Sequence, residues 1–433
     1  MTKFINPLTR PSLWAGLSVS ALLLLGACGE APMESRSELS GAAAPPSEAM
    51  IAPAPVIMAE APMPSSGGRY TNPRRGVVTA GDIDDTLNLA QFQRYQSKTA
   101  KRLGLPSTNM SGMVRMQLLT NAGKPAPGVA YNLRKPGAAD PFYQGVSGVD
   151  GRIAVLPSVH GAGSPKRVEL RVFGEGQNYH SADHRVGKSQ QVRLPVDGGY
   201  APDFLDLVFV FDTTGSMGDE LAWLTKEFSG IVQTARRAAP GANMRFGLVA
   251  YRDQGDAYVV RNFGFTKRQG QMQGWLRSLD ASGGGDYPEA AAEAMQAAAA
   301  LNWRRGKGER LVFHIADAPP HKAKASRYIK AARMLAAKDV QIFGLGASGV
   351  AEESELMMRQ AAALSAGRYM FLTDDSGIGH AHAEPTVACY RVTRLKSLLN
   401  RVLTSELTGI RREARASDVI RDVGTYRNGY CRQ

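Results

Sequence analysis

Cysteine is scarce in this chain of 433 residues, which has three, at positions 28, 389 and 431. They do not form closely spaced pairs, so the usual zinc-finger spacings are excluded. Aromatic residues make up 7% of the chain and charged residues 21%, while 43% of the residues are hydrophobic. This balance excludes both a fully disordered chain and a polytopic membrane protein, and it predicts a soluble core.

Motifs typical of enzymes and of nucleic-acid-binding proteins are also missing. The sequence has no H-E-x-x-H, G-x-S-x-G or kinase motif, and no RNA-binding signature. Lys and Arg outnumber Asp and Glu by 52 to 39, which gives a net charge of +13, but the basic residues are spread along the chain. We therefore expect a solvated basic surface, no nucleic-acid partner and no enzymatic activity. A hydrolase that uses metal-activated water is the weakest alternative, because no general base lies at a suitable spacing.

The first 27 residues have the features of a signal peptide. Lys3 and Arg10 precede an apolar stretch at 13–25, which is shorter than the roughly 20 residues that span a bilayer and so argues against a retained transmembrane helix. The sequence Leu25-Gly26-Ala27-Cys28 resembles the bacterial lipobox. This resemblance implies that Cys28 becomes the first mature residue and carries acyl chains such as palmitate, which anchor the protein in the membrane. Gly29, rather than Asp, follows the cysteine, which in this pattern implies the outer membrane rather than the inner.

The two remaining cysteines are predicted to pair with each other. Export places Cys389 and Cys431 in an oxidising compartment, and neither has another possible partner once Cys28 is acylated. Two free thiols are the alternative.

The regions outside the two expected folded domains can be assigned from their composition. Residues 28–68 are rich in Ala, Pro, Ser and Met and are expected to form a disordered tether. Residues 69–110 are expected to form a linker with one short helix. Its acidic residues Asp82, Asp84 and Asp85 either cap this helix or bind calcium, and the absence of an EF-hand loop favours capping. Residues 411–433 are expected to be a basic tail.

Residues 111–198 alternate between apolar and polar positions, as half-buried strands do. The short alternating runs are separated by turn sequences such as Asn121-Ala122-Gly123-Lys124-Pro125, which predicts a small antiparallel β-sandwich. The sequences NAGKPAPGVAYNL and GVDGRIAVLPS resemble the carboxypeptidase-regulatory or transthyretin-like sandwich modules of bacterial envelope proteins.

Residues 201–410 show a different pattern, in which solid apolar runs alternate with amphipathic helices. The predicted parallel strands are 205–211, 246–251, 311–315, 340–345 and 369–372, and the predicted helices are 219–239, 288–301, 323–338, 351–364 and 393–407. An antiparallel edge strand is expected at 258–265. This order predicts an α/β fold, a doubly wound and mostly parallel Rossmann-like sheet.

Oxygen-bearing side chains follow two of these predicted strands. Asp212, Thr214 and Ser216 come after the first strand, and Asp317 comes after the third. In doubly wound sheets ligands bind beyond the carboxyl ends of the strands, and hard divalent cations prefer carboxylate and hydroxyl oxygens. The sequence LVFVFDTTGSMGDEL resembles the metal-ion-dependent adhesion site of the von Willebrand factor A family, whose pattern is D-x-S-x-S.

The resemblance implies a set of ligands for Mg²⁺, or for Mn²⁺ or Ca²⁺. Asp212, Thr214 and Ser216 match the D-x-S-x-S pattern, with Thr214 in place of its first Ser, and Asp317 matches the family's later Asp. The family also supplies a Thr from a Gly-rich loop. The corresponding loop SGGGDYPEAA has no Thr, so Asp286 is the candidate ligand there. Asp219 and Glu220 either serve a neighbouring metal or stabilise the start of the following helix, and we favour the helix.

Two functions are consistent with these features. The first is an envelope-anchored binding or adhesion-type lipoprotein, in which the metal accepts an acidic side chain of a protein partner. The second is an accessory or regulatory subunit of an envelope enzyme or secretion complex, in which the metal is structural.

Overall fold

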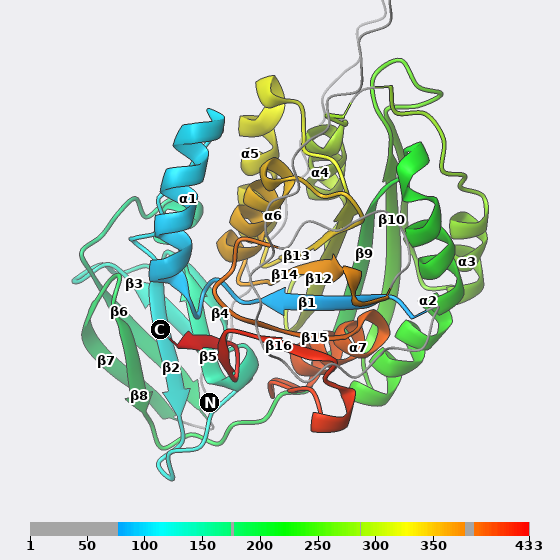
Figure 1. Cartoon of the computed structure of the whole chain (residues 1–433). Helices are drawn as coiled ribbons and strands as arrows, with labels where there is room; N and C mark the ends of the chain where they lie inside the picture. Colours follow the sequence, from blue (N-terminus) through cyan, green and yellow to red (C-terminus); the bar gives the residue numbers. More distant parts are fainter. Residues whose placement is uncertain (1–76, 175–176, 286, 377–384, 433) are drawn as a thin grey trace, which may run out of the picture. The chain divides into compact units, whose positions relative to one another are not determined.

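A computed structural model describes residues 77–174, 177–285, 287–376 and 385–432 (Figure 1). The predicted signal peptide, Cys28, the tether and Asp286 therefore lie outside the described residues. No helix in the described ranges is long and apolar enough to cross a membrane.

A nine-stranded sheet forms the centre of the α/β body, with the strand order β11-β10-β9-β12-β13-β14-β1-β15-β16. Its five parallel strands are β9 (Phe204–Asp212), β10 (Asn243–Tyr251), β12 (Gly308–Ala316), β13 (Gln341–Gly346) and β14 (Tyr369–Thr373). β11 (Val260–Thr266) pairs antiparallel with β10 at one edge. The doubly wound, mostly parallel sheet that the sequence predicts is confirmed, together with its antiparallel edge strand.

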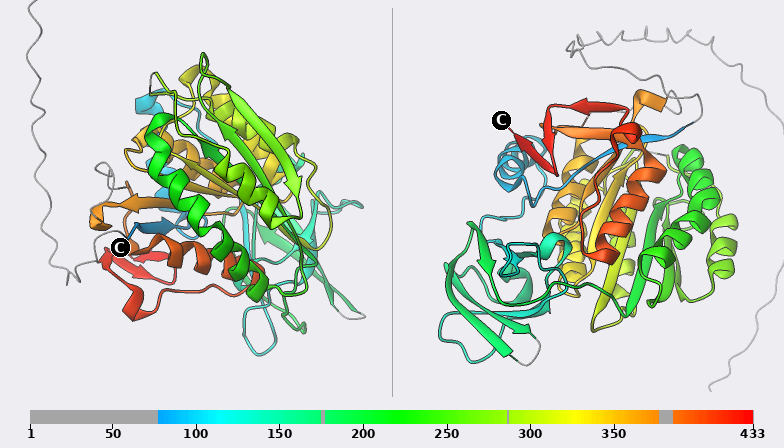
Figure 2. Two further views of the ribbon diagram at one scale, coloured as in Figure 1. Left: turned by 90° about the vertical axis from the view of Figure 1, so that its right-hand side faces the viewer. Right: turned by 90° about the horizontal axis from the view of Figure 1, so that it is seen from below.

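Helices cover both faces of this sheet, as Figure 2 shows. One face packs against α2 (Gly218–Ala238), α3 (Gln269–Arg277) and α7 (Leu395–Thr408). The other packs against α1 (Leu89–Leu103), α4 (Ala291–Ala300), α5 (Ala325–Ala336) and α6 (Glu352–Leu364). The strands are solid apolar runs because both of their faces are buried: every residue of β9 is buried.

The segment expected to be a linker contributes a strand to this sheet. β1 (Thr79–Ile83) lies between β14 and β15 (Tyr390–Arg394) and pairs antiparallel with both. All five of its residues are buried. Because neighbours on both sides satisfy its backbone groups, a short strand with few apolar residues is held in the interior.

The C-terminal segment is also folded, where a basic tail was expected. It forms β16 (Arg421–Val423), which pairs with β15, and the hairpin of β17 (Thr425–Arg427) and β18 (Tyr430–Arg432). A disulfide joins Cys389 to Cys431, as predicted, with their Cα atoms 5.3 Å apart. This bond ties the hairpin to the residue that precedes β15.

The region between α1 and β9 contains two small sheets that share one hydrophobic core. The first consists of β2 (Val114–Leu119), β5 (Arg152–Val155) and β8 (Ser189–Arg193). The second consists of β3 (Ala130–Arg134), β4 (Tyr143–Val146), β6 (Arg167–Gly174) and β7 (Gln177–Arg185). The pairing of β2 with β8 is parallel, where an antiparallel arrangement was expected, because the chain between them crosses to the other sheet.

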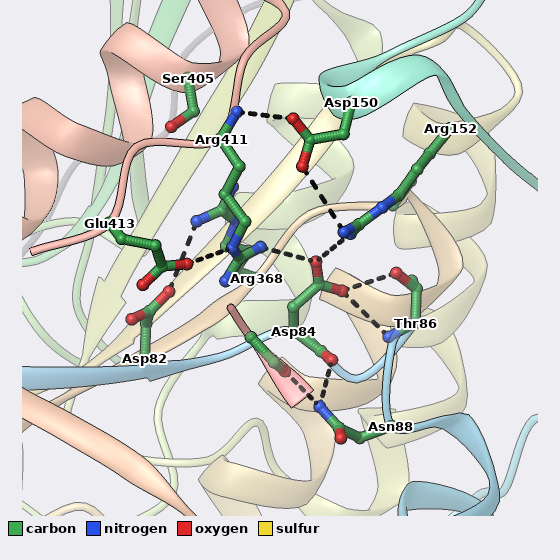
Figure 3. A network of polar contacts seen from close by, with 12 residues as sticks. Asp82, Asp84, Thr86, Asn88, Asp150, Arg152, Arg368, Ser405, Arg411 and Glu413 are labelled. Carbon is green, nitrogen blue, oxygen red and sulfur yellow. Dashed lines mark hydrogen bonds and ion pairs between the residues drawn. The ribbon is translucent and has the colours of Figure 1, made fainter. Parts of the chain in front are cut away.

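A network of buried ion pairs joins β1, this sandwich and the C-terminal segment (Figure 3). Asp84 lies 3.3 Å from Arg411 and 3.5 Å from Arg152, and its other oxygen accepts hydrogen bonds from Thr86. Burial opposes the charge of Asp84, but the nearby arginines hold its pKa below the usual value. The backbone N–H of Arg411 donates to the Asp150 carboxylate of the sandwich at 3.0 Å. Asp82 and Asp85 likewise pair with Arg368 and Arg359, at 3.6 and 2.8 Å. The three acids therefore act through buried ion pairs rather than as the simple helix caps that we favoured.

Candidate metal centre

The predicted ligands gather at the carboxyl edge of the central sheet. Asp212 is the last residue of β9, and Asp317 directly follows the neighbouring parallel strand β12. Thr214 and Ser216 lie in the short connection between β9 and α2. The register pairs Phe211 with Ile315, so the two carboxylates leave neighbouring strands within one residue of the same level.

Hydrogen bonds orient the predicted ligands but leave one oxygen of each carboxylate without a partner among the described residues. The N–H and Oγ1 of Thr214 donate to Asp212 Oδ1 at 2.9 and 2.8 Å. Thr214 Oγ1 and Ser216 Oγ are 3.5 Å apart, and the Ser216 hydroxyl also bonds to Asp317. Asp212 Oδ2 and Asp317 Oδ1 are buried and have no hydrogen-bond partner among the described residues. Buried carboxylate oxygens without a partner are costly, so their presence on adjacent strands calls for a ligand.

The pKa values of Asp212 and Asp317 are both raised. Burial raises the pKa of Asp212 to about 7, Asp317 acts in the same direction, and the bonds from Thr214 oppose the rise. Burial also raises the pKa of Asp317, against the hydrogen bond from Ser216. Two buried acids that repel each other favour binding of a cation.

Glu289 joins the site, although sequence reasoning did not single it out. Its N–H donates to the Pro319 carbonyl at 2.9 Å, which holds it beside the loop that follows β12. A Cβ at Gly284 would lie 2.8 Å from Glu289 Oε1 and 3.0 Å from Thr214 Cβ, so these two side chains border the same small space. Glu289 Oε2 is buried and has no hydrogen-bond partner in the described part of the chain. A signal was present in the sequence, since the Gly-rich loop carries two acids, but Glu289 read as part of the next helix.

Glu289, like Asp212, is surrounded by other acids that raise its pKa. Burial raises the pKa of Glu289 to about 9, and Asp212, Asp253, Asp256 and Asp317 add to the rise. A buried acid surrounded by four others is a feature of sites that hold a cation or share protons.

Further polar residues hold the rim of the site. His321 Nε2 lies 2.6 Å from Asp253 Oδ1, so this histidine is joined to a carboxylate. The Asp256 carboxylate accepts hydrogen bonds from the N–H of Asp253 and of Gly284, which fixes the Gly-rich loop. The Tyr287 hydroxyl donates to the Asp317 carbonyl at 3.1 Å, while 45% of the residue stays exposed.

Asp219 and Glu220 differ from each other. Both lie in the first turn of α2. Asp219 is exposed, whereas Glu220 is buried and accepts hydrogen bonds from the Ser348 N–H and hydroxyl at 3.2 and 2.9 Å. Glu220 therefore ties α2 to the loop after β13, in addition to favouring the positive end of its helix.

The donor set fits a hard divalent cation. Two carboxylates with free oxygens and two hydroxyls are the ligand types that Mg²⁺ uses, with water completing the shell. In the described ranges no group of three or more His, Cys, Asp or Glu side chains is placed to hold a metal by itself. The hydroxyls of Thr214 and Ser216 are therefore essential to the fit.

The comparison with protein families agrees with this architecture. Residues 206–383 match the family model described as von Willebrand factor A domain. We refer to this part of the chain as the VWA domain, after the von Willebrand factor A family that it matches. The match begins within β9 and covers Asp212, Thr214, Ser216 and Asp317, so the candidate metal centre lies inside the VWA domain.

Two curated proteins are similar to parts of the chain. An ariadne-like RING finger protein of Acanthamoeba polyphaga mimivirus is 33% identical over 123 residues, which are 28% of this chain and 12% of that protein. An alpha-protein kinase of Dictyostelium discoideum is 26% identical over 135 residues, which are 31% of this chain and 21% of that protein. The matched segments thus span about a tenth and a fifth of these relatives.

Solved structures show weaker similarity. BatB of Bacteroides thetaiotaomicron is 17% identical, with a TM-score of 0.31 over 41% of this chain and 90% of that one. The open form of the pilus adhesin SpaC of Lactobacillus rhamnosus GG is 12% identical, with a TM-score of 0.33 over 56% of this chain and 31% of that one. At these TM-scores neither structure bears on the function of this chain.

Proposed function

We propose that this chain is a lipid-anchored envelope protein whose VWA domain binds Mg²⁺ and, through it, a protein partner. Asp212, Thr214, Ser216 and Asp317 would hold the ion. Bound Mg²⁺ would supply an open coordination position for an acidic side chain of the partner. The role is one of binding rather than catalysis.

A single observation carries the proposal. Asp212 Oδ2 and Asp317 Oδ1 are buried, lie on adjacent strands and lack partners, while Thr214 and Ser216 place two hydroxyls beside them. Asp206, at the opposite end of β9, is neutralised instead: it is paired with Arg245 and Arg304 at 2.6 Å each. The contrast within one strand favours a ligand site over a structural arrangement.

The charge of the site decides how well it accepts an acidic partner. Asp212 and Asp317 alone would neutralise a divalent cation. Ionised Glu289 would leave one net negative charge, and ionised Asp286 would add another. A partner carboxylate would then be repelled at short range in a partly buried site, where charges interact more strongly than in water.

Titration calorimetry with MgCl₂ tests the metal site. The wild-type chain should bind one Mg²⁺, and Asp212→Asn should abolish binding because it removes the charge of a central ligand. Asp203→Asn is the matched control, since Asp203 is exposed just before the other end of β9. Unchanged binding by Asp212→Asn would disprove this site.

Partner capture tests the proposed role of the metal. Binding of a partner from envelope extracts should be lost when a chelator is added, and it should be lost in Asp212→Asn. Capture that survives chelation would favour the accessory-subunit function, in which the metal is structural.

The lipid anchor needs its own test. Wild-type protein should fractionate with membranes, and Cys28→Ser should release it because the acylated thiol is lost. Membrane fractionation that does not change in Cys28→Ser would overturn the anchor and leave the metal site unaffected.

A further inference from the structure

A cavity of about 620 Å³ lies away from the metal centre, where three parts of the fold meet. The loop after α1 lines it with residues 107–109, 111 and 112, helix α5 with Arg333, and the sandwich with the entry to β6 and the end of β7. This volume is within the usual range for sites that bind small molecules. Neither the VWA match nor the metal centre accounts for it.

The cavity is lined by positive charge. Lys166, Arg167, Arg185 and Arg333 contribute to its wall, and none of the described residues that line it is acidic. Arg167 forms an ion pair with Asp183, so one of the four charges is compensated. Within the described part of the chain, Lys166 and Arg185 form no ion pair, which leaves an uncompensated positive field.

Arg333 is fixed without being neutralised. Its Nη2 donates to the Ser158 carbonyl at 3.2 Å and lies 3.3 Å from the Ser158 hydroxyl. These neutral acceptors orient the guanidinium from helix α5 against the sandwich and leave its charge in place. A guanidinium with free donors suits the planar, multiple contacts that phosphate oxygens offer.

Neutral donors complete the wall. Asn109 Oδ1 accepts hydrogen bonds from the Ser111 N–H and hydroxyl at 2.9 and 2.7 Å. This fixes the loop and leaves the Asn109 amide NH₂ group as a donor. The hydroxyls of Ser107 and Ser164 also lie in the lining.

These groups select the chemistry of the ligand. The arginines, Lys166 and the Asn109 amide only donate, so the ligand must present acceptor oxygens, some of them charged. Serine hydroxyls can both donate and accept, as sugar and polyol hydroxyls require. No aromatic side chain is among the described residues of the lining, so nothing there would stack on a nucleobase.

We propose that this cavity binds a phosphorylated sugar or polyol. The phosphate lies among Lys166, Arg185 and Arg333, and the hydroxylated body faces Asn109 and the serine side of the wall. Because α5 belongs to the VWA domain and Arg185 to the sandwich, the ligand bridges the two. The proposal does not depend on the metal centre.

Calorimetry on the full chain tests this site with four probes: glucose 6-phosphate, glucose, inorganic phosphate and AMP. Glucose 6-phosphate should bind more tightly than the other three, and its affinity should fall as NaCl is raised because the attraction is partly exposed to solvent. Arg185→Gln and Lys166→Gln should each weaken its binding by about tenfold. Arg193→Gln, on the exposed surface of β8 and outside the cavity, is the control and should bind normally.

Four results would overturn the proposal. If glucose bound as tightly as glucose 6-phosphate, Lys166, Arg185 and Arg333 would not contribute to binding. Inorganic phosphate binding equally well would remove the role of the hydroxylated body, and tighter binding of AMP would make the cavity a nucleotide site. Equal losses in Arg193→Gln and Arg185→Gln would mean that the affinity comes from the general surface charge.

Discussion

The α/β body contains two groups of buried acids, one paired with an arginine and one with unpartnered oxygens among the described residues. At β1 and α6, Asp85 and Glu355 both contact the guanidinium of Arg359, at 2.8 and 2.7 Å. At the carboxyl ends of β9 and β12, Asp212, Asp317 and Glu289 each keep a buried oxygen without a partner in the described structure. The first group, here called the paired acids, carries its own cations, and the second, the open acids, does not.

The presence of a neighbouring cation distinguishes acids that stabilise the fold from acids that we propose bind a ligand. Burial raises the pKa of Asp85 and of Glu355, but Arg359 opposes the rise in both, and against burial the two acids in turn raise the pKa of Arg359. Burial raises the pKa of Asp212 and Glu289 to about 7 and about 9, with further acids adding to the rise. Burial alone does not mark a functional site, whereas burial without a counter-charge does.

The largest expected effect comes from removing a cation from the paired acids. Arg359→Met leaves Asp85 and Glu355 buried without a counter-charge, and it should lower the free energy of unfolding by about 3–5 kcal/mol. Urea denaturation measures the loss. Arg327→Met, at an exposed position of α5, should change stability by less than about 0.5 kcal/mol. Equal effects of the two variants would erase the distinction between paired and open acids.

The disulfide tests whether the C-terminal hairpin, which is bonded to Asn88 at the start of α1, needs a covalent tie. Cys389 and Cys431 are 42 residues apart, and the double variant Cys389→Ser/Cys431→Ser should lose about 3–4 kcal/mol of stability in the chain-entropy description. Thermal unfolding of the variant and of reduced wild type should agree. A loss below about 1 kcal/mol would show that the ion pairs and strand pairing already hold the segment.

A buried histidine close to the open acids should produce part of the acid denaturation. His314 lies between the hydroxyls of Tyr251 and Tyr328, at 3.1 and 3.0 Å, and burial lowers its pKa to about 3. Its neutral form is favoured in the fold, so this contribution to stability is complete above about pH 6.5. It should fall by up to about 1.4 kcal/mol per pH unit as the pH drops from 6.5 toward 3.

Two variants measure the contribution of His314 to the pH dependence of stability. His314→Gln should unfold with a shallower dependence on pH below 6.5, whatever its stability at neutral pH. His180→Gln, at a largely exposed position of the sandwich, should keep the wild-type slope. If the slopes of the two variants match, His314 does not control acid unfolding.

The smallest expected effect concerns the open acids. Glu289→Gln keeps the shape of the side chain, so metal-free stability should change by less than about 1 kcal/mol. Mg²⁺ affinity should weaken by about three- to tenfold, because one attractive charge near the ion is lost. Asp219→Asn, which removes an exposed acid at the start of α2, should leave the affinity unchanged. Unchanged affinity in Glu289→Gln would place Glu289 outside the reach of the ion.

The sequence predicts the body of the VWA domain well because its strands are continuous apolar runs. The predicted strand 205–211 is one residue short of β9 at each end, and 369–372 starts with β14 and ends one residue before it. The strands made by β1 and β16 could not be predicted in this way. Thr79–Ile83 contains one large apolar residue and Arg421–Val423 is three residues long, so only their partners in the sheet identify them.

The candidate metal centre shows the same limit. Asp212 and Asp317 follow recognisable strands, so their meeting at one edge of the sheet is predictable from topology. Glu289 reaches the site because its backbone is bonded to the loop after β12, and no local pattern encodes that contact. The neutralisation of Asp84 by Arg411 joins residues 327 positions apart, which sequence reading cannot detect.

The position of β1 has a consequence for the order in which the protein can fold. Thr79 is bonded to Thr373 across 294 residues, and β1 sits between two strands that are made late during synthesis. The sandwich consists of one continuous stretch and can complete its contacts early, whereas the large sheet must wait for the end of the chain. Pairing over so great a sequence distance requires closing a very long loop, which slows the search for the native state. Until β14 and β15 emerge, β1 has no place to dock, so the earliest described strand must wait for two strands from the last quarter of the chain.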